Sequence, residues 1–316
     1  MMHSAESVCL VLNGKAAMRD DVRAAVHAIR QQGCDVDVRV TWESGDAADF
    51  ARRAADSGVA VVVAGGGDGT LNEVTRGLLD GCHSIKQVPS LAVLPLGTAN
   101  DLARACNVPI DPLLAMRLAA FGDAYEIDVG RANGRYFVNV ATGGFGAQVT
   151  TATPNELKRI LGSAAYVVTG LTHFTSIRAA RGRLSGPGLA REGSFLLLAV
   201  GNGRQSGGGH QLCPEALLDD GLLDVVVLPE LPPSEIASTL RALLREGAVA
   251  IGDALVRARV TWLEIETEEP LQINLDGEPL TADRFRFEID ARRLRMKLPP
   301  DCPLLTRFPA AATRKD

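Results

Sequence analysis

The stretch VAVVVAG at residues 59–65 is the feature that most constrains the fold of this chain. A continuous Val-rich run of this length is typical of a strand that is buried on both faces, as strands of parallel sheets are. Further strand patterns occur at residues 8–13, 35–40 and 91–97. Apolar residues at helical spacing lie between these runs, so the first 122 residues alternate strand and helix. This alternation predicts an α/β fold with a doubly wound, mostly parallel sheet and helices on both faces.

Two helix starts can be predicted from capping residues. Ser44 is a candidate N-cap for a helix that runs through Phe50 to Asp56. Asp111 and Pro112 occupy the N-cap and first positions of another helix, which should end near Gly122.

The pattern changes at about Tyr125. Two strands flank an Asn-Gly turn at Asn133–Gly134, and further strands are expected at 194–200, 222–228, 262–267 and 284–290. Two helices are expected within this half, at about 157–168 and 234–244. We therefore expect an α/β domain of the kind that binds nucleotides at 1–124 and a mainly antiparallel β-sandwich domain at 125–299. The tail at 300–316 should pack on the first domain. A cleft should lie between the two domains.

Composition narrows the classes of function. The chain has 316 residues and a formal net charge of -5, which argues against nucleic acid as a partner. Its six cysteines form no C-x-x-C pair, which argues against zinc-ribbon and thioredoxin sites. The first 15 residues do not resemble a signal peptide, and no run approaches the roughly 18 apolar residues of a membrane span. We expect a cytoplasmic protein that reaches any lipid substrate by transient contact with the inner membrane surface. The sequence leaves the choice between a monomer and a homodimer open.

The glycine-rich stretch GGGDGTLNEV follows the buried strand and precedes a helix. Backbone N–H groups of such a loop and the positive end of the helix dipole can bind a phosphate. A carboxylate at Asp68 would repel polyphosphate unless a cation lies between them, so Asp68 implies Mg²⁺. A tight turn without a ligand is the alternative. The spacing matches neither the dinucleotide fingerprint nor the P-loop.

A second loop, LPLGTANDLAR at residues 94–104, also lies between a strand and a helix. It should emerge at the same carboxyl edge of the sheet, where open α/β sheets bind ligands. Thr98 offers a hydroxyl group, and Asp101 offers a second carboxylate. Asn100 and Asp101 could equally serve only as a helix cap.

These two loops resemble the signatures of the diacylglycerol kinase catalytic-domain superfamily, and the wider sequence resembles the bacterial YegS-like lipid kinases. The similar stretches run from about residue 8 to residue 305 and include NVATGGFG, GNGRQSGGGHQLCPEALLDDGLLDV and NLDGEPL. The resemblance implies a phosphofructokinase- and NAD-kinase-like first domain that binds ATP. The implied ATP contacts are Thr41, Gly67, Asp68, Gly69, Thr70, Leu71, Asn72, Glu73 and Thr98. The stretch LNGKAAM departs from the Asn-Pro motif of many relatives, which leaves contacts by Asn13 and Lys15 open.

The stretch INLDGEPL predicts a hairpin turn at Asp276–Gly277. By resemblance, Glu278 is the general base that takes the proton from a lipid hydroxyl as it attacks the γ-phosphoryl group of ATP in the interdomain cleft. The lipid would be of the phosphatidylglycerol or diacylglycerol type, and the sequence does not choose between them.

The acidic stretch PEALLDDGLLDV at 214–225 is open to two interpretations. A solvated turn is the usual role of such a cluster. The resemblance implies a second metal site, for Mg²⁺ or Ca²⁺, made by Asp220 with the backbone carbonyls of Leu217 and Leu222. Asp128 could join the Mg²⁺ network or be structural, and a substrate contact by His210 also stays open.

Two other functions compete with the lipid kinase. One is a kinase of a soluble substrate, related to NAD kinase. The other is a sensor that binds a nucleotide or a metal without catalysis, which is disfavoured because competent residues occupy all the candidate catalytic positions.

Overall fold

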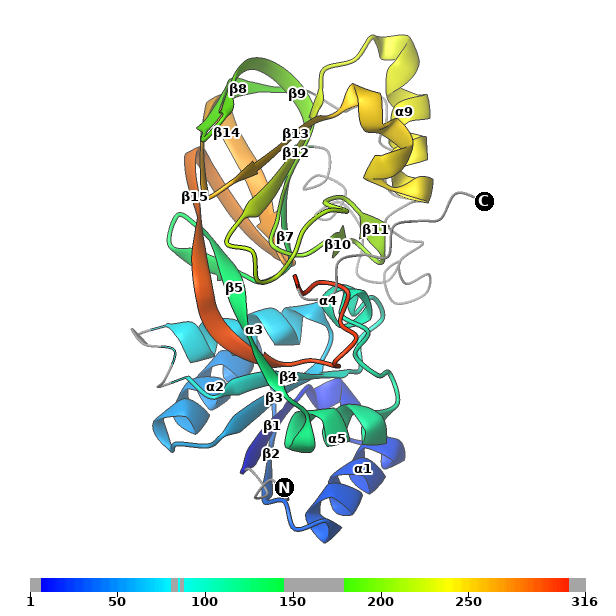
Figure 1. Cartoon of the computed structure of the whole chain (residues 1–316), viewed down its shortest axis with the longest axis vertical. Coiled ribbons are helices and arrows are strands. Elements are labelled where there is room, and N and C mark those ends of the chain that lie inside the picture. The colour runs from blue at the N-terminus through cyan, green and yellow to red at the C-terminus, as the bar shows by residue number, and fades with distance from the viewer. Residues whose placement is uncertain (1–6, 81–84, 86–87, 145–178, 307–316) are drawn as a thin grey trace. The chain divides into compact units, whose positions relative to one another are not determined.

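The computed structural model describes residues 7–80, 85, 88–144 and 179–306. These residues form two compact units. The first unit contains the described residues up to Val129, the segment Leu218–Asp220 and the described residues from Ala291 onwards. The second contains the described residues of 130–217 and 221–290. Strands β5 (Ala124–Ala132) and β15 (Glu278–Lys297) carry the chain from one unit into the other (Figure 1).

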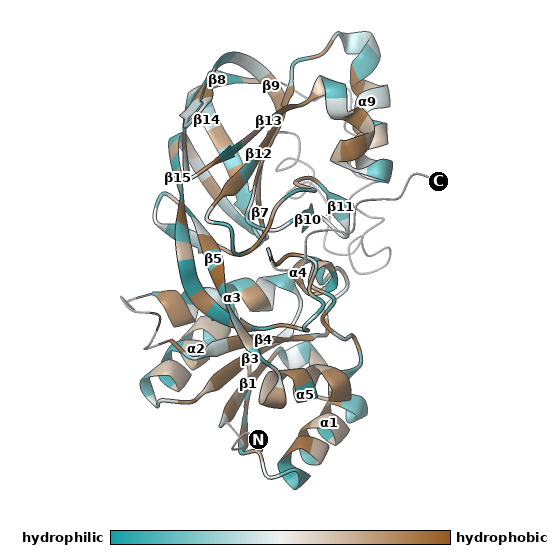
Figure 2. Ribbon diagram, in the orientation of Figure 1, coloured by the Kyte–Doolittle hydropathy of each residue, from teal (hydrophilic) through white to brown (hydrophobic). Residues whose placement is uncertain are grey.

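The first unit is built on a parallel sheet. Its strands lie in the order β2 (Val36–Val40), β1 (Val8–Leu12), β3 (Val61–Gly66) and β4 (Ser90–Pro95), and Met296 of β15 pairs in parallel with Leu91. All residues of β1, β3 and β4 are buried, as expected for strands covered on both faces. Figure 2 shows these three strands brown over most of their length.

Helices cover this sheet. Helices α1 (Asp20–Gln31) and α5 (Pro112–Phe121) contact each other and share one apolar core with the sheet, in which Val26, Ile29 and Met116 are buried. Helices α2 (Asp46–Asp56) and α3 (Asp68–Leu79) form another contacting pair, and both contact β3. The short elements η1 (Gly14–Ala16) and α4 (Asp101–Ala105) follow β1 and β4. The predicted alternation of strands and helices is therefore confirmed.

The two predicted helix starts had different outcomes. Asp111 is the N-cap of α5 and accepts a hydrogen bond from the N–H of Leu114, with Pro112 in the first turn, as predicted. Ser44 was the wrong residue for the cap of α2, because Gly45 in a left-handed conformation occupies that position.

The second unit is a largely antiparallel β structure. The strand order is β13 (Val256–Val260), β12 (Leu223–Pro229), β9 (Leu189–Gly201), β7 (Val140–Gly144), β14 (Trp262–Leu275) and β15. Strand β8 (Ala180–Gly186) also pairs with β9 and β14, beyond the end of β7. Strand β6 (Arg135–Phe137) pairs with β5, and β10 (Gln205–Ser206) pairs with β11 (His210–Gln211).

Two apolar cores stabilise this unit. One contains the rings of Phe137, Phe285 and Phe287, and the edge of one ring meets the face of another at 6.2 Å between the centroids of Phe137 and Phe287. The other lies under α9 (Pro233–Glu246) and η4 (Ala248–Ala254), where Leu240 and Leu243 are buried. The predicted helix at 234–244 is α9, and the one at 157–168 lies outside the described residues.

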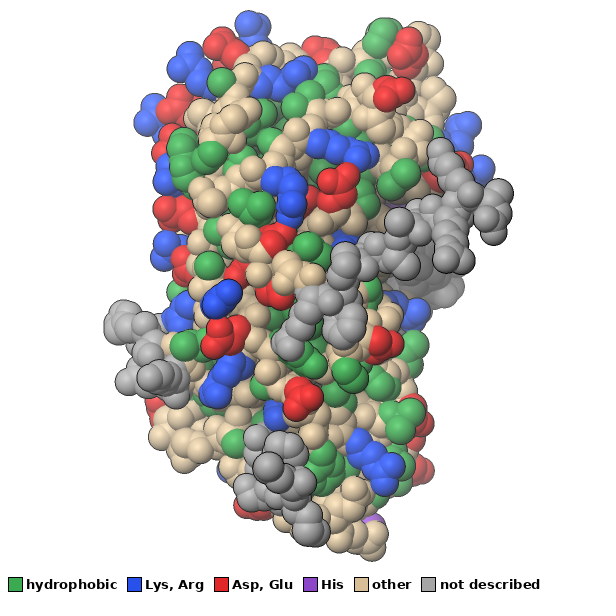
Figure 3. All heavy atoms as spheres, viewed as in Figure 1, with side chains coloured by type: hydrophobic (Ala, Val, Ile, Leu, Met, Phe, Trp, Pro, Cys, Tyr) green, Lys and Arg blue, Asp and Glu red, His purple; other side chains and the backbone are tan. Residues whose placement is uncertain are grey.

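Charged side chains of both signs are interspersed over the coloured residues of the face in Figure 3. Ion pairs of this kind also join β14 to β15. Arg286 lies 2.6 Å from Glu264, and Arg284 lies 3.4 Å from Glu266. Such exposed pairs contribute little to stability individually, about 0–1 kcal/mol.

Gly77 provides a test of the packing between α2 and α3. A Cβ atom at Gly77 would overlap the backbone of Ala48 in α2. Alanine is favoured over glycine in a helix interior by about 1 kcal/mol, but the backbone of α2 cannot move aside without loss of packing. We expect Gly77→Ala to lower the free energy of unfolding by about 1–3 kcal/mol in urea titrations followed by circular dichroism.

Gly69 in the same helix is the matched control, because a Cβ atom there meets nothing within 4 Å. We expect Gly69→Ala to be at least as stable as the native chain. Equal stability of Gly77→Ala and the native chain would contradict this account of the α2–α3 contact.

Candidate functional site

Two glycine loops pack backbone against backbone at the carboxyl ends of β3 and β4. The carbonyl of Gly66 accepts hydrogen bonds from the N–H groups of Leu96 (2.8 Å) and Gly97 (3.2 Å). A Cβ atom on Gly97 would lie 2.5 Å from the Cα of Gly67. Only glycine fits at such a contact, so the closeness of the two loops depends on these residues.

The close approach of the loops brings two carboxylate residues together. Oδ1 of Asp68 accepts a hydrogen bond of 2.8 Å from the backbone N–H of Asp101. Asp101 itself is buried. Asp68 therefore lies at the start of α3 beside the start of α4, which agrees with the expectation that both loops contribute to one edge of the sheet.

Asn100 is the N-cap residue of α4, in a left-handed conformation with φ of 50°, but its side chain does not cap the helix. Its Oδ1 accepts from the N–H of Gly97 at 2.9 Å, and its Nδ2 donates to the carbonyl of Gly97 at 2.8 Å. The side chain of Asn100 thus fixes the shape of the loop that carries Thr98, which is exposed.

The first turn of α3 is open to a ligand. Its N-cap residue, Gly67, provides no side chain to bond the first N–H groups of the helix. The first four N–H groups of a helix have no acceptor within the helix, and the helix dipole is positive at this end. Apart from its chain neighbours and the backbone of α3 itself, no described atom lies within 4 Å of the position that a Cβ on Gly69 would take. An anion can therefore approach the backbone there.

A pocket of about 520 Å³ lies beside this turn. It is lined by segments that follow β1 and β2 and by the starts of α2 and α3. The lining residues are Asn13, Gly14, Lys15, Thr41, Trp42, Glu43, Ser44, Ala47, Thr70 and Glu73.

Three of the predicted ATP contacts, Thr41, Thr70 and Glu73, line this pocket, and so do Asn13 and Lys15. The other predicted contacts are outside its lining. Leu71 and Asn72 have buried side chains in α3, and the N–H of Leu71 donates to the carbonyl of Gly67 at 3.1 Å.

Hydrogen bonds fix the polar residues of the pocket. Thr41 donates its N–H to the carbonyl of Leu12 at 2.9 Å, and its Oγ1 accepts from the N–H of Gly14 at 3.3 Å. Nδ2 of Asn13 donates to Oγ1 of Thr70 at 3.3 Å. Oε2 of Glu73 accepts from the N–H of Gly45 at 3.0 Å. Glu73 therefore holds the start of α2 as well as lining the pocket.

Five other residues that line this pocket were not predicted from the sequence: Gly14, Trp42, Glu43, Ser44 and Ala47. The only signal was their position after the ends of two neighbouring parallel strands. Oδ2 of Asp46 accepts from the N–H groups of Trp42 (2.7 Å) and Glu43 (2.9 Å). The bonds from Glu43 and Trp42 lower the pKa of Asp46. Asp46, not Ser44, thus shapes the turn before α2.

In the second unit, Glu278 follows the predicted hairpin turn. Leu275 pairs with Glu278, and Asp276 and Gly277 both have positive φ values, 48° and 106°. The side chain of Glu278 is exposed. The turn at Asp276–Gly277 is confirmed, as is the one at Asn133–Gly134.

Asp276 and Asn274 hold this turn in place. The carboxylate of Asp276 accepts hydrogen bonds from the N–H groups of Val138 (2.6 Å), Asn139 (3.2 Å) and Val140 (2.9 Å). Oδ1 of Asn274 accepts from the N–H of Gly277 at 2.7 Å. The backbone that presents Glu278 is therefore tied to the start of β7 by a charged acceptor.

Asp128 and Asp219 bond to the backbone of the first unit. Oδ1 of Asp128, which is buried, accepts from the N–H of Arg292 at 2.7 Å. The carboxylate of Asp219 accepts from the N–H (2.8 Å) and the Oγ1 (3.0 Å) of Thr306. Both residues thus have a structural role.

The predicted second-metal ligands Leu217, Asp220 and Leu222 lie in the segment between β11 and β12, where Gly221 has a positive φ of 74°. Within the described ranges no three His, Cys, Asp or Glu side chains are grouped as a metal site. A site made partly with backbone carbonyls does not require such a group of side chains, so the second metal stays a prediction. His210 lies in β11, and its proposed substrate contact also stays a prediction.

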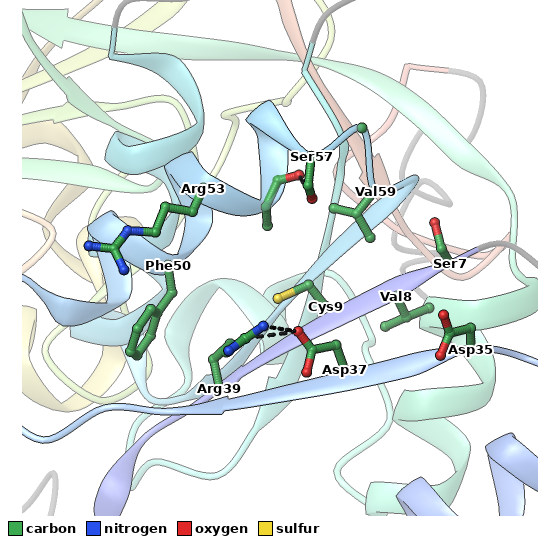
Figure 4. A pocket seen from close by; sticks show the side chains of 12 residues that line it. Ser7, Val8, Cys9, Asp35, Asp37, Arg39, Phe50, Arg53, Ser57 and Val59 are labelled. Carbon is green, nitrogen blue, oxygen red and sulfur yellow. Dashed lines mark hydrogen bonds and ion pairs between the residues drawn. The ribbon is translucent and has the colours of Figure 1, made fainter.

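A second pocket in the first unit, of about 470 Å³, is lined by residues of β1, β2, α2 and the turn after α2 (Figure 4). Arg39 pairs with Asp37 at 2.7 Å near the thiol of Cys9. Burial, together with the charge of Asp37, raises the pKa of Cys9 to about 11, so the thiol is protonated at neutral pH and is a poor nucleophile. None of the residues predicted to bind ATP lines this pocket.

The role of Asp276 can be tested by stability. Asp276→Ala would leave three backbone N–H groups without their acceptor, and bonds to a charged group contribute about 1.5–3 kcal/mol each before partial replacement by water. We expect a loss of about 2–4 kcal/mol in urea unfolding. Asp283→Ala, at an exposed carboxylate on β15, is the control and should change stability by less than about 0.5 kcal/mol. Similar effects of the two substitutions would contradict this role.

Comparisons with known proteins identify the family that this chain resembles. Residues 7–132 match the model of the diacylglycerol kinase catalytic domain, and residues 139–297 match the YegS C-terminal NAD kinase beta sandwich-like domain. The chain is 51% identical over 304 residues to "Probable lipid kinase YegS-like" of Pseudomonas aeruginosa, covering 96% of this chain and 98% of the relative. It is 49% identical over 303 residues to a relative of the same name from Xanthomonas oryzae pv. oryzae, covering 94% and 98%. A crystal structure of "a putative diacylglycerol kinase" from Bacillus anthracis str. Sterne matches with a TM-score of 0.78 and 26% identity, covering 95% of this chain and 97% of that one.

Proposed function

This chain belongs to the family of YegS-like lipid kinases, and on that premise we propose that it transfers the γ-phosphoryl group of ATP to a hydroxyl group of a phosphatidylglycerol- or diacylglycerol-type lipid. Family membership makes the chain a phosphotransferase, and a kinase implies the use of ATP. The observation that carries the proposal is the packing of the two glycine loops, which brings Asp68 to Asp101 at the open N-terminus of α3.

The nucleotide would bind along the first unit. Its phosphates would lie against the backbone N–H groups of the first turn of α3, where Gly69 leaves the approach open. Thr98, which is exposed, would offer its hydroxyl to the same phosphates. Thr41 and Thr70 would contact the rest of the nucleotide from the lining of the pocket. Lys15 would supply a positive charge at its edge.

The residues present suit Mg²⁺. This cation prefers oxygen ligands and is commonly held by one or two carboxylates together with substrate phosphates and water. The carboxylates of Asp68 and Asp101 would hold the ion, and the backbone N–H of Asp101 donates to Oδ1 of Asp68 at 2.8 Å. When bound, Mg²⁺ would neutralise part of the negative charge that the phosphates carry.

Glu278 would act as the general base. As the lipid oxygen forms its bond to the γ-phosphorus and the bond to the leaving ADP oxygen breaks, the hydroxyl proton would pass to the carboxylate of Glu278. The bonds made by Asp276 and Asn274 would keep the base at a defined position, which is what phosphoryl transfer requires.

Access to the lipid would be peripheral. Among the described residues, no helix is long and apolar enough to cross a membrane. We propose that the enzyme meets its substrate at the membrane surface. A second metal, bound by Asp220 with the carbonyls of Leu217 and Leu222, would stabilise the segment before β12.

Asp68 and Glu278 can be tested by substitution. Asp68→Asn keeps the acceptor for the N–H of Asp101 but removes the charge, so we expect lipid phosphorylation to fall by at least about 100-fold without loss of stability. Glu278→Gln should lower kcat by about 100- to 10,000-fold while the Kd for ATP stays unchanged.

Glu266→Gln is the control for Glu278, because it removes an exposed carboxylate from the same unit. It should retain native kcat. Full turnover by Glu278→Gln would remove the assignment of the base.

Gly69→Ala separates binding from stability. The added methyl group would occupy the open space through which the phosphates approach the helix, so we expect the Kd for ATP to rise about tenfold or more, a change of about 1.4 kcal/mol. The urea midpoint should not fall. Native affinity for ATP in this variant would show that the phosphates bind elsewhere.

The acceptor can be identified with radiolabelled ATP and a total lipid extract, followed by chromatography of the labelled product. We expect a labelled phospholipid. Labelling of NAD with no labelled lipid would overturn the proposal.

A further inference from the structure

Trp42 is displayed to solvent to an unusual degree. Its relative exposure is 96%, the largest among the exposed hydrophobic residues of the described chain. The other tryptophan of the sequence, Trp262, is half-buried, and the guanidinium carbon of Arg286 lies 4.4 Å from its ring centroid. An indole is large, flat and apolar, so a ring as exposed as this one offers a face on which an aromatic ligand can stack.

The backbone around Trp42 is held firmly. The N–H of Trp42 donates to Oδ2 of Asp46 at 2.7 Å. The preceding residue, Thr41, is bonded through its N–H to Leu12 and through its Oγ1 to Gly14. A rigid backbone that presents an exposed ring loses little entropy when a ligand stacks on that ring.

The charges of the pocket indicate which part of a ligand Trp42 faces. The lining contains one cationic side chain, Lys15, against the carboxylates of Glu43 and Glu73. A polyphosphate would therefore gain little from this part of the site, whereas the N-terminus of α3 favours it. A flat base and a ribose, which are uncharged, suit a lining of an indole, hydroxyl groups and carboxylates.

We propose that the adenine base of ATP stacks on the indole ring of Trp42, and that Trp42 thereby determines affinity for the base and not for the phosphates. This inference rests on the proposed use of ATP at the same site. Stacking of a base on an aromatic side chain is worth about 1–3 kcal/mol by alanine substitution.

The first experiment uses fluorescence. The variant Trp262→Phe leaves Trp42 as the single indole, since the sequence contains two tryptophans. We expect ATP with Mg²⁺ to quench its emission saturably and inorganic tripolyphosphate to leave the emission unchanged. The lipid kinase activity of this variant is measured alongside to establish that it is folded and competent.

The second experiment measures affinity in the otherwise native chain. We expect Trp42→Ala to raise the Kd and the KM for ATP about 5- to 150-fold, with little change in kcat. This range is the fold-change that corresponds to a stacking free energy of about 1–3 kcal/mol. The Kd for tripolyphosphate should stay the same. Trp42→Phe retains an aromatic ring and should recover most of the affinity for ATP.

The outcomes separate the inference from the proposed function. Native affinity for ATP in Trp42→Ala, with no quenching by ATP, would overturn the role of Trp42 while ATP binding stands. Failure of the native chain to bind ATP at all would overturn both. A change in Trp42 emission on phosphatidylglycerol vesicles but not on ATP would assign the indole to the membrane surface and also overturn the inference.

Discussion

The approach of Gly67 to Gly97 is the contact on which the candidate nucleotide site depends. Any side chain at Gly97 would collide with the Cα of Gly67, so the two loops meet only as bare backbone. This contact allows the carbonyl of Gly66 to accept two N–H groups and allows Asp68 to reach the N–H of Asp101. If the loops were separated, the carboxylate of Asp68 could not accept the N–H of Asp101, and the starts of α3 and α4 would no longer be joined.

Carboxylates elsewhere in the chain accept hydrogen bonds from backbone N–H groups. Asp46 bonds the turn before α2, Asp276 bonds the start of β7, and Asp128 bonds Arg292, whose φ of 50° is unfavourable for a residue with a side chain. A carboxylate that accepts several N–H groups substitutes for regular secondary structure where the chain turns sharply. In an acidic cluster, the backbone bonds already made by each carboxylate therefore limit which residues can serve chemistry.

Much of the fold could be predicted because local patterns and packing agreed. The Val-rich run of β3, the Asp111–Pro112 cap and the Asn-Gly and Asp-Gly turns each depend on neighbouring residues. Strand β14 extends to Leu275, well past the predicted end at 267. The prediction stopped early because a register shift between Glu266 and Leu271 interrupts the alternation of apolar and polar residues. Trp42 and Gly14 were not predicted as site residues, because they line one pocket only once β1 and β2 have paired, with Leu12 opposite Val40.

The proposed position of the Asp68 carboxylate in an anion-binding loop would couple the binding of Mg²⁺ to the binding of ATP. The helix N-terminus and the N–H of Asp101 stabilise the charge of Asp68. In the proposed site, the same charge, added to that of Asp101, would repel free polyphosphate and attract a divalent cation. Mg²⁺ and ATP should therefore each bind more tightly in the presence of the other. The cation reduces the repulsion between the carboxylates and the phosphates, and the phosphates offset the positive charge of the cation. On the proposed assignment, the two carboxylates would favour the metal–nucleotide complex over the free nucleotide.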